Sequence, residues 1–340
     1  MKEMIPILVA GGAGYIGSHT AKLLWQSGFQ PVVLDSLVTG NRWAVRFGPF
    51  VEGSIGNSSL VEQIVKEYAI QGAILLAAHA YVSESTTQPA KYYRNNIAES
   101  INFLDGLLAA GVRRLVYSSS CSIYGMQKTI PIHESSPTFP LSPYAETKLF
   151  LEKVLSWYEQ AYGLRSVCLR YFNAAGADPE GELGECHEPE THLIPLAIRA
   201  VLGGPELCIM GADYETPDGT AIRDYVHVSD LADAHLRALK FLVRGGSGVT
   251  FNCGSGAGHS VREVVEKVSA ISSREVPVCY AERRQGDAPI LIADTASIRE
   301  ALGWHPRLSS LDTIIQTAWS WATQGRLRQS AGRDFLTSAG

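Results

Sequence analysis

A glycine-rich turn near the N-terminus constrains the fold of this chain more than any other feature of its sequence. Gly11, Gly14 and Gly17 follow the apolar run Ile5–Ala10 and lead into an amphipathic stretch near residues 15–27. Glycines permit a tight turn, so backbone N–H groups and the positive N-terminus of a helix can hold a pyrophosphate. The pattern therefore predicts a strand, a phosphate-binding turn and a helix, which together begin a dinucleotide-binding fold.

An acidic residue after the second apolar run supports this interpretation. Asp35 directly follows Pro31–Leu34 and lies 18 residues after Gly17. A ribose-binding acid is expected about 20 residues beyond such a turn. A carboxylate at this position accepts a hydrogen bond from the ribose 2′-OH and repels a 2′-phosphate. We therefore expect NAD, rather than NADP, as the cofactor.

Short apolar runs alternate with helical stretches throughout the first half of the chain. The runs are Ile5–Ala10, Pro31–Leu34, Ala73–Ala78, Leu115–Tyr117 and Ser166–Leu169, and the helical stretches lie near 15–27, 58–68, 95–110 and 144–161. Such alternation is typical of a parallel sheet that is covered by helices on both faces. It predicts an α/β protein with a Rossmann-type doubly wound sheet.

The second half is less regular and richer in glycine, proline and charge, which predicts a smaller C-terminal α/β lobe. We expect an NAD-binding domain over residues 1–172, to which some later segments return. A substrate-binding lobe is expected over residues 173–323, followed by a mobile tail over 324–340.

Composition excludes several classes of protein. The 340 residues carry a formal net charge of −5, so neither nucleic acid nor an anionic membrane surface is expected as a partner. No apolar stretch approaches the roughly 20 residues of a membrane-spanning helix, and Met1–Ala10 lacks the features of a signal peptide. The six cysteines form no CxxC pair, which favours a reduced, cytoplasmic protein. The histidines show no HExxH motif, so no metal site is expected.

A second motif places a tyrosine and a lysine on one face of a helix. Pro143 is typical of a first helical turn, and the four-residue spacing of Tyr144 and Lys148 puts both side chains on the same side. A tyrosine with its ordinary pKa of about 10 is a poor base at pH 7. A nearby ammonium and a cationic nicotinamide both favour the phenolate, so we expect the pKa of Tyr144 to fall. Ser120 lies at the polar end of a preceding strand, where it can hydrogen-bond a substrate hydroxyl while Tyr144 takes the proton.

Taken together, these features resemble the extended short-chain dehydrogenase/reductase superfamily and, within it, the UDP-glucose 4-epimerases. The resemblance extends from about Ile5 to Trp321 and is carried by segments that include Gly11–Thr20, Leu115–Gly125, Tyr144–Lys148, Leu169–Pro179, Glu190–Leu196, Asp218–Asp233 and Tyr280–Asp287. It implies an isomerase that interconverts UDP-glucose and UDP-galactose through a 4-keto sugar and enzyme-bound NADH. By this resemblance Tyr144 takes the proton of the sugar 4-OH, Lys148 lowers the pKa of that tyrosine and holds the nicotinamide ribose, and Ser120 bridges the sugar O4.

The resemblance also implies two sets of binding residues. The NAD contacts are expected from Gly11, Gly14, Tyr15, Ile16, Gly17, Asp35, Ser54, Ile55, Leu76, Ala77, Ala78, Asn96, Ser118, Tyr144, Lys148 and Tyr171. The UDP-sugar contacts are expected from Ser120, Tyr144, Asn173, His192, Leu193, Cys208, Ile209, Met210, Arg223, Arg284 and Asp287. Arg223 and Arg284 match pyrophosphate-binding arginines, and Asp287 matches a carboxylate on the uridine ribose. A homodimer through the helices near 95–110 and 144–161 is common in the superfamily and is expected here.

Several positions depart from the family pattern. Ser54 stands where the family usually carries an aspartate that accepts a hydrogen bond from the adenine amine, so NAD is expected to bind less tightly than in a relative with that aspartate. Glu99 replaces a common glycine, and His192 replaces an asparagine of some members. The branched Leu291 lies near the space for the C2 substituent and disfavours a bulky N-acetyl sugar.

Other functions on the same scaffold fit this sequence less well than an epimerase. Nucleotide-sugar dehydratases and decarboxylases use carboxyl residues next to the serine position, but Cys121 and Ser122 stand there. A sugar dehydrogenase with exchangeable NAD would accumulate NADH, whereas an epimerase would not. A non-catalytic NAD-binding protein could dispense with the Tyr144–Lys148 pair, which this chain retains. Pentose, uronic acid or N-acetylhexosamine nucleotides remain alternative substrates.

Overall fold

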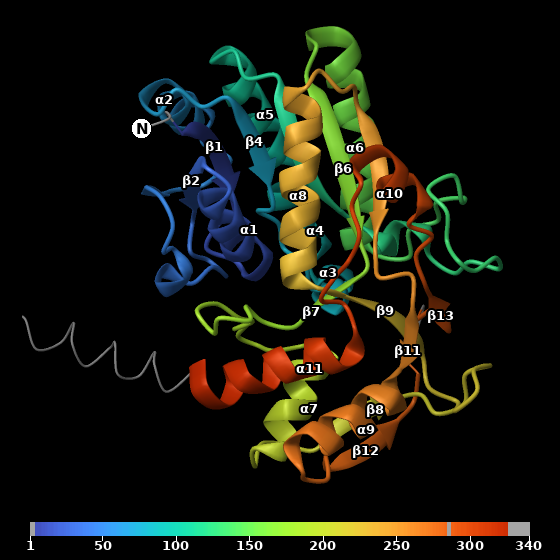
Figure 1. The fold of residues 1–340 in the computed structure, drawn as a ribbon. Helices are drawn as coiled ribbons and strands as arrows, with labels where there is room; N and C mark the ends of the chain where they lie inside the picture. Colours follow the sequence, from blue (N-terminus) through green and yellow to red (C-terminus); the bar gives the residue numbers. More distant parts are fainter. Residues whose placement is uncertain (1–3, 284–286, 326–340) are drawn as a thin grey trace, which may run out of the picture.

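A seven-stranded parallel sheet forms the centre of the larger lobe in the computed structural model, which describes residues 4–283 and 287–325 (Figure 1). The strand order is β10-β6-β5-β4-β1-β2-β3, and every neighbouring pair is parallel. The bounds are β1 Ile5–Ala10, β2 Phe29–Asp35, β3 Phe50–Glu52, β4 Gly72–Leu75, β5 Arg114–Ser120, β6 Arg165–Tyr171 and β10 Val249–Cys253. The doubly wound α/β class predicted from the sequence is confirmed.

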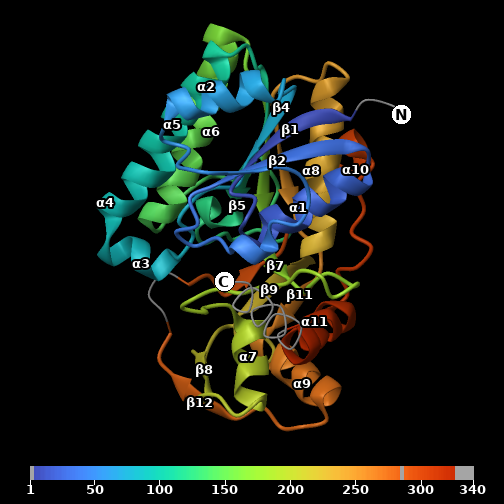
Figure 2. The same ribbon diagram turned by 90° about the vertical axis from the view of Figure 1, so that its left-hand side faces the viewer.

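Helices cover both faces of this sheet (Figure 2). One face carries α1 (Tyr15–Gln26), α8 (Val228–Val243) and α10 (Ala296–Leu302). The other carries α2 (Ser58–Glu67), α5 (Ser100–Ala109) and α6 (Pro143–Tyr162). Because α8, α10 and β10 come from the second half of the sequence, the chain crosses between the lobes more than once.

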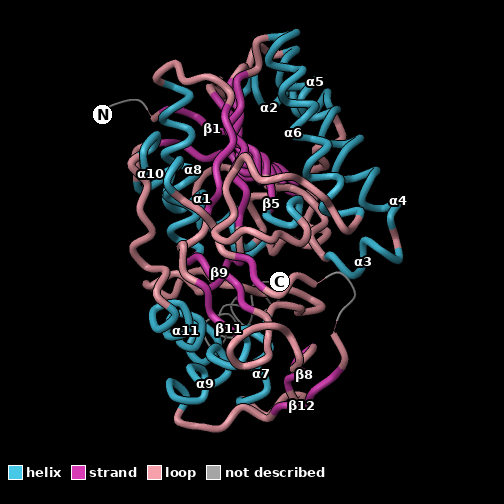
Figure 3. The backbone as a smooth tube through the Cα atoms, turned by 90° about the vertical axis from the view of Figure 1, so that its right-hand side faces the viewer, coloured by secondary structure: helices cyan, strands magenta, loops and turns pink. Residues whose placement is uncertain are grey.

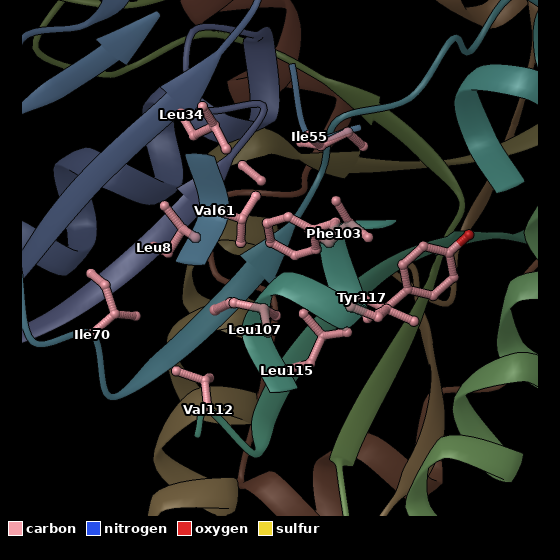
Figure 4. Packing of buried hydrophobic residues seen from close by; sticks show 14 of the residues in the cluster. Leu8, Leu34, Ile55, Val61, Ile70, Phe103, Leu107, Val112, Leu115 and Tyr117 are labelled. Carbon is pink, nitrogen blue, oxygen red and sulfur yellow. The ribbon is translucent and has the colours of Figure 1, made fainter. Parts of the chain in front are cut away.

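The continuous apolar runs are explained by burial on both faces of the sheet. Successive side chains of a strand point to opposite faces. Thus Leu8 packs with Leu34 and Phe103 under α2 and α5 (Figure 4), whereas Ile7 and Val9 pack on the face of α1 and α8. A strand with only one buried face would alternate apolar and polar residues instead.

The chain changes direction across the sheet at β1. From β1 it proceeds outward to β2 and β3, and it then returns to the other side of β1 as β4. Ligands of open α/β sheets bind at the carboxyl edge of the sheet, at such a reversal. The turn after β1 and the loop after β4 therefore flank the expected cofactor crevice.

The smaller lobe lies below this carboxyl edge (Figure 3). It contains a four-stranded sheet of β7 (Asn173–Ala175), β9 (Ile222–His227), β11 (Gly258–Ser260) and β13 (Ile290–Leu291), and a separate pair of β8 (Leu207–Met210) and β12 (Val278–Ala281). Three helices, α7 (Leu193–Val201), α9 (Val261–Ser272) and α11 (Leu311–Ser320), pack around a core of their own. In the part of the chain that the structure describes, no helix is long and apolar enough to cross a membrane.

Two sequence-based boundaries differ from the structure. The run Ala73–Ala78 is a strand only as far as Leu75, because the N–H groups of Leu76 and Ala77 both donate to the Ala10 oxygen and turn the chain out of the sheet. The helical stretch near 95–110 consists of two elements, a π-helical segment, Tyr93–Glu99, and α5. Two short helices, α3 (Val82–Thr87) and α4 (Pro89–Tyr92), precede it. Most of the predicted tail, residues 326–340, lies outside the described residues.

Candidate active site

The glycine turn leaves room for an anion at the start of α1. The residue before this helix is Gly14, which has no side chain to cap the helix, so the first N–H groups of α1 remain available to a ligand. Gly11 has a φ of +85°, and a β-carbon on it would lie 2.5 Å from the Ala77 nitrogen. A β-carbon on Gly17 would lie 2.1 Å from the Gly11 oxygen. The turn is therefore closely packed on its protein side, as a pyrophosphate-binding turn requires.

Asp35 is positioned at the carboxyl end of β2 by two backbone hydrogen bonds. Its Oδ2 accepts from the Ala13 nitrogen and its Oδ1 from the Leu37 nitrogen, both at 2.9 Å. Burial raises the pKa of Asp35, and these two hydrogen bonds oppose that rise. Each carboxylate oxygen retains a lone pair that can accept from a ribose hydroxyl.

Ser54 and Glu99 form a pair that the sequence did not reveal. Ser54 follows β3, and its hydroxyl donates to Glu99 Oε2 at 2.8 Å while it accepts from the Gly56 nitrogen at 2.9 Å. Gly56 gives this carboxylate its space, because a β-carbon on Gly56 would lie 2.8 Å from Glu99 Cγ. A carboxylate therefore lies beside residue 54, although it is carried by the π-helical segment before α5.

Ser120, Tyr144 and Lys148 meet at the carboxyl edge of the sheet. Ser120 ends β5, and α6 begins at Pro143 beneath the cap of Ser142, whose hydroxyl accepts from the Ala145 nitrogen at 3.2 Å. Tyr144 and Ser120 share a side-chain hydrogen bond. One helical turn later, Lys148 is buried and its Nζ donates to the Ser118 oxygen at 2.6 Å.

The ionisation of this group differs from the sequence-based expectation. Burial raises the pKa of Tyr144 to about 12, and the hydrogen bond with Ser120 only partly offsets the rise. Burial also lowers the pKa of Lys148 to about 7, with Glu152 acting in the opposite direction. The Lys148 nitrogen lies 5.8 Å from the centre of the Tyr144 ring and is directed at a backbone oxygen. Without NAD, burial therefore outweighs the hydrogen bond with Ser120 and raises the pKa of Tyr144. The expected fall, which includes the charge of a bound nicotinamide, stays a prediction.

The other predicted NAD residues lie around the same crevice, in four kinds of position. Tyr15, Ile16 and Gly17 begin α1, whereas Leu76, Ala77 and Ala78 form the loop after β4. Ser118 lies near the end of β5, and Tyr171 is the last residue of β6. Ile55 is buried in the segment that follows β3. The Tyr171 hydroxyl contacts His235 Nε2, so this group is already engaged with α8.

The amide group of the Asn96 side chain forms hydrogen bonds with other groups of the protein. Its Oδ1 accepts from the His79 nitrogen at 2.9 Å, and its Nδ2 donates to the His79 oxygen at 3.0 Å and to Thr147 Oγ1 at 3.1 Å. Asn96 therefore fixes the loop after β4 against α6, beside the lysine and the tyrosine.

Arg223 extends from β9 toward the serine turn. Its charge lowers the pKa of the Cys121 thiol, against the larger rise that burial causes, so the guanidinium lies within electrostatic range of the residue next to Ser120. It also opposes the raised pKa of Tyr214, to which burial and the Asp287 carboxylate contribute. Arg223 hydrogen-bonds the Ile222 oxygen at 2.9 Å and forms no ion pair with any carboxylate in the described ranges. The predicted Arg284 lies outside the described residues.

The remaining predicted substrate residues divide by their exposure. Asn173 begins β7, and His192 and Leu193 lie where the loop from β7 enters α7; all three positions remain at least partly exposed. On β8 the Cys208 side chain is exposed while that of Ile209 is buried. Alternation along the strand places Cys208 and Met210 on one side, so Ile209 can offer a ligand only its backbone.

Sequence reasoning missed three features of the site. It gave no role to Glu99, which contacts Ser54, or to Tyr214, which lies near Arg223 and Asp287. It also missed the loop at 184–187, which lines a small pocket together with Ala13, Gly14 and Tyr15. Only the spacing of Glu185 and His187 within the charged segment before α7 could have drawn attention to that loop.

The buried lysine leads to a prediction about stability and pH. The unfolded chain holds the Lys148 proton up to its ordinary pKa of 10.5, whereas the folded chain releases it near 7. The cost of burying this charge is therefore greatest below pH 7, and it disappears as the pH rises toward 10.5. Between pH 7 and pH 10, the ligand-free protein is expected to gain about 3 kcal/mol of unfolding free energy relative to Lys148→Met.

Urea denaturation of both proteins at the two pH values measures this difference, because other titrating groups cancel in the comparison. The exposed Lys153 on the same helix provides the control substitution, Lys153→Met. A Lys148→Met difference that is as independent of pH as the control would show that burial does not perturb this lysine.

The comparisons with known proteins agree with this geometry. The profile of the NAD dependent epimerase/dehydratase family matches residues 7–254. The UDP-glucose 4-epimerase of Azospirillum brasilense is 47% identical over 329 residues, which cover 96% of this chain and 94% of the relative.

Two solved structures share the fold over nearly the whole length. The UDP-glucose 4-epimerase of Brucella ovis in complex with NAD is 50% identical, with a TM-score of 0.91 and coverage of 93% of this chain and 97% of that one. The UDP-glucose-4-epimerase from Stenotrophomonas maltophila, with bound NAD and formylated UDP-arabinopyranose, is 35% identical, with a TM-score of 0.91 and coverage of 96% and 99%. With its glycine turn, its Tyr144–Lys148 pair and this similarity across nearly the whole chain, the protein belongs to the NAD dependent epimerase/dehydratase family.

Proposed function

We propose that this protein is an NAD-dependent isomerase that interconverts UDP-glucose and UDP-galactose by inverting C4 of the sugar. The observation that carries the proposal is the convergence of Ser120, Tyr144 and Lys148 at the edge of a sheet whose glycine turn fits a dinucleotide. The relatives named above support it, since they are UDP-glucose 4-epimerases and match over nearly the whole chain.

NAD, when bound, supplies the hydride acceptor and donor for C4. The side chains of this protein accept the proton of the sugar hydroxyl and return it. Ser120 is hydrogen-bonded to Tyr144, so a sugar hydroxyl that contacts both can pass its proton to the phenol. With a pKa of about 12, the phenol of the protein alone is a weak base at neutral pH. Positive charge near the ring must therefore accompany ligand binding, and Lys148 is positioned to provide part of it.

A UDP group fits the side of the site that the smaller lobe contributes. Arg223 lies within electrostatic range of both Cys121, next to Ser120, and Tyr214. Its guanidinium has no carboxylate partner in the described part of the chain and suits a diphosphate. Asp287 is close enough to Tyr214 to affect its pKa and is proposed to accept from the uridine ribose.

The residues after Ser120 argue against a dehydratase or a decarboxylase. Cys121 is buried, and burial raises the pKa of its thiol to about 12, so it cannot serve as an acid or base near neutral pH. The Ser122 hydroxyl donates to Ser120 Oγ at 2.9 Å and serves the hydrogen-bond network of that serine. An epimerase needs no carboxyl group at these two positions.

The substitution Tyr144→Phe tests the assigned reaction. Incubating the full chain with UDP-galactose and separating the products is expected to show UDP-glucose without accumulation of NADH. Removal of the phenolic oxygen is expected to lower the turnover number at least 100-fold, the usual contribution of a general acid–base group. The exposed Tyr162 at the end of α6 supplies the control, because Tyr162→Phe keeps full activity. Wild-type activity in Tyr144→Phe would remove the phenol from the mechanism.

The Ser54–Glu99 pair changes the expectation about NAD affinity. The sequence predicts weak binding because residue 54 lacks a carboxylate, but Glu99 brings one to within 2.8 Å of it. We propose that this carboxylate accepts a hydrogen bond from the adenine amine. Glu52 at the end of β3 lies opposite Asp35 in the sheet register, so Ser54, which follows β3, is on the same side of the crevice as the ribose-binding carboxylate. Glu99 thus takes over the role that the resemblance assigns to an aspartate at residue 54.

Measured NAD dissociation constants test this exchange. Glu99→Gln is expected to weaken NAD binding about 10-fold, the value of one charge-assisted hydrogen bond. Ser54→Asp alone is expected to weaken it as well, because two carboxylates would meet, whereas Ser54→Asp combined with Glu99→Gly restores it. If Glu99→Gln binds NAD as tightly as the wild type, the carboxylate does not contact the adenine.

A homodimer is proposed through α6 and the π-helical segment before α5. Phe150 and Trp157 are seven residues apart on α6, and their side chains are 48% and 68% exposed. Tyr93 of the π-helical segment is also exposed. Large apolar side chains that share one exposed face are typical of an interface between protein chains.

Analytical ultracentrifugation tests the proposed interface. The wild type is expected to sediment as a dimer and Trp157→Glu as a monomer, because a buried interface does not tolerate an unpaired carboxylate. Trp25 on α1 is exposed as well, and Trp25→Glu serves as the control that remains dimeric. A dimer in Trp157→Glu would place the interface elsewhere.

A cytoplasmic location and the domain division at residue 172 also stay proposals.

A further inference from the structure

Four metal-ligand side chains converge in the loop between β7 and α7. Glu185, His187, Glu190 and His192 occupy eight consecutive positions, and their ligand atoms all lie within 4.8 Å of one another. The Nδ1 atom of His187 lies 3.1 Å from an oxygen of Glu185 and 3.8 Å from an oxygen of Glu190. The Nδ1 atom of His192 lies 3.9 Å from the second oxygen of Glu190 and hydrogen-bonds Glu185.

These separations approach those around a small tetrahedral ion. Bonds of about 2.1 Å to zinc place neighbouring ligand atoms about 3.4 Å apart. Three of the four distances, 3.1, 3.8 and 3.9 Å, lie on either side of that value. Only the His192–Glu185 hydrogen bond has to open for an ion to enter.

Three of the four side chains in the cluster are largely buried, and the fourth, that of His192, is half exposed. The side chains of Glu185 and Glu190 are 6% and 11% exposed, and that of His187 is 20% exposed. His187 Nδ1 is buried and has no well-aligned hydrogen-bond partner within residues 4–283 and 287–325. Its nearest acceptor, a Glu185 oxygen at 3.1 Å, is itself a candidate ligand, so one ion could bind both atoms.

The source of positive charge distinguishes this cluster from a second acidic group nearby. There, Lys22 Nζ lies 2.8 Å from Asp178 and 2.8 Å from Glu182, and it also pairs with Glu180. Around Glu185 and Glu190, by contrast, no lysine or arginine in the described part of the chain forms an ion pair. A lysine neutralises the Asp178 group, whereas the carboxylates of Glu185 and Glu190 are neutralised by their own histidines, whose pKa values they raise. A cation can replace the protons of these histidines, because an imidazole must lose its proton to bind a metal.

Contacts from both lobes position the loop for this role. The Cys186 oxygen accepts from Asn41 Nδ2 at 3.0 Å, the Pro189 oxygen from the Tyr81 hydroxyl at 3.1 Å and the Glu185 oxygen from Trp321 Nε1 at 3.1 Å. The rings of Tyr15 and Tyr81 stand edge-on to His187. Ligands held by such outer contacts lose little freedom when a metal binds.

We propose that Glu185, His187, Glu190 and His192 bind one divalent transition-metal ion of the zinc class. Two imidazoles and two carboxylates suit zinc, cobalt or nickel better than magnesium or calcium, which prefer oxygen ligands. The ion displaces the protons of the two imidazoles, after which the two carboxylates balance its charge. The ion binds Nδ1 of His192 and leaves its Nε2 for the UDP-sugar contact that the family resemblance implies. The sequence predicted no metal because these spacings match no common motif.

Metal binding is measured on the full chain with its NAD and without a histidine tag, after treatment with EDTA. Dialysis against micromolar Zn²⁺, followed by elemental analysis, is expected to give one ion per chain. Dialysis against Co²⁺ is expected to give the visible absorption of a tetrahedral site. His187→Gln and Glu190→Gln are expected to weaken zinc binding at least 10-fold. His259→Gln provides the control, because His259 of β11 forms a histidine–glutamate pair of similar separation, 3.8 Å, with Glu263 of α9.

Two results would overturn the proposal. One is a wild type that retains no zinc under these conditions, and the other is a folded His187→Gln or Glu190→Gln variant that binds zinc as the wild type does. Melting temperatures in EDTA establish that each variant folds, and zinc is expected to raise the value of the wild type and the control only. These readouts do not use turnover, so they stand apart from the success or failure of the epimerase assay.

Discussion

The close approach of the glycine turn to the strand ends is the constraint on which the rest of the structure depends. Gly17 packs so tightly on Gly11 that a β-carbon would lie 2.1 Å from its oxygen, and Gly11 in turn packs against the loop that follows β4. This contact brings α1 onto the sheet at the point where the strand order reverses. The reversal brings Asp35, Ser120 and the start of α6 to one edge of the sheet, where a dinucleotide and a sugar can meet.

Burial, more than pairing of charges, determines the ionisation of the candidate active site. The lysine next to the tyrosine is buried deeply enough to bring its pKa to about 7, and the tyrosine rises to about 12. The structure of the protein alone therefore holds a weak base and a partly charged lysine. A cationic ligand lowers the pKa of the tyrosine and so favours the phenolate, which ties the reactivity of the site to the presence of its ligands.

Residues close together in the sequence were predicted well. The strand–turn–helix at the N-terminus, Asp35 at the end of β2 and the Tyr144–Lys148 face of α6 all follow from spacing within about 20 residues, because one element or two adjacent elements fix their geometry. Pairs formed between distant segments were not predicted. Ser54 and Glu99 are separated by 45 positions, and the influence of Arg223 on Cys121 spans two lobes. No local pattern encodes such contacts.

The sequence by itself determined the class of fold, the phosphate-binding turn and the identity of the catalytic candidates, since each depends on short-range periodicity or on residue chemistry. Only the tertiary structure decided how far each ionisable group is buried and which distant groups it meets. It decided that a carboxylate reaches residue 54 from a π-helical segment, and that two histidines and two glutamates of one loop face each other. The physical reason is that desolvation and charge–charge interactions depend on distance and solvent access in three dimensions, which the order of residues along a chain does not specify.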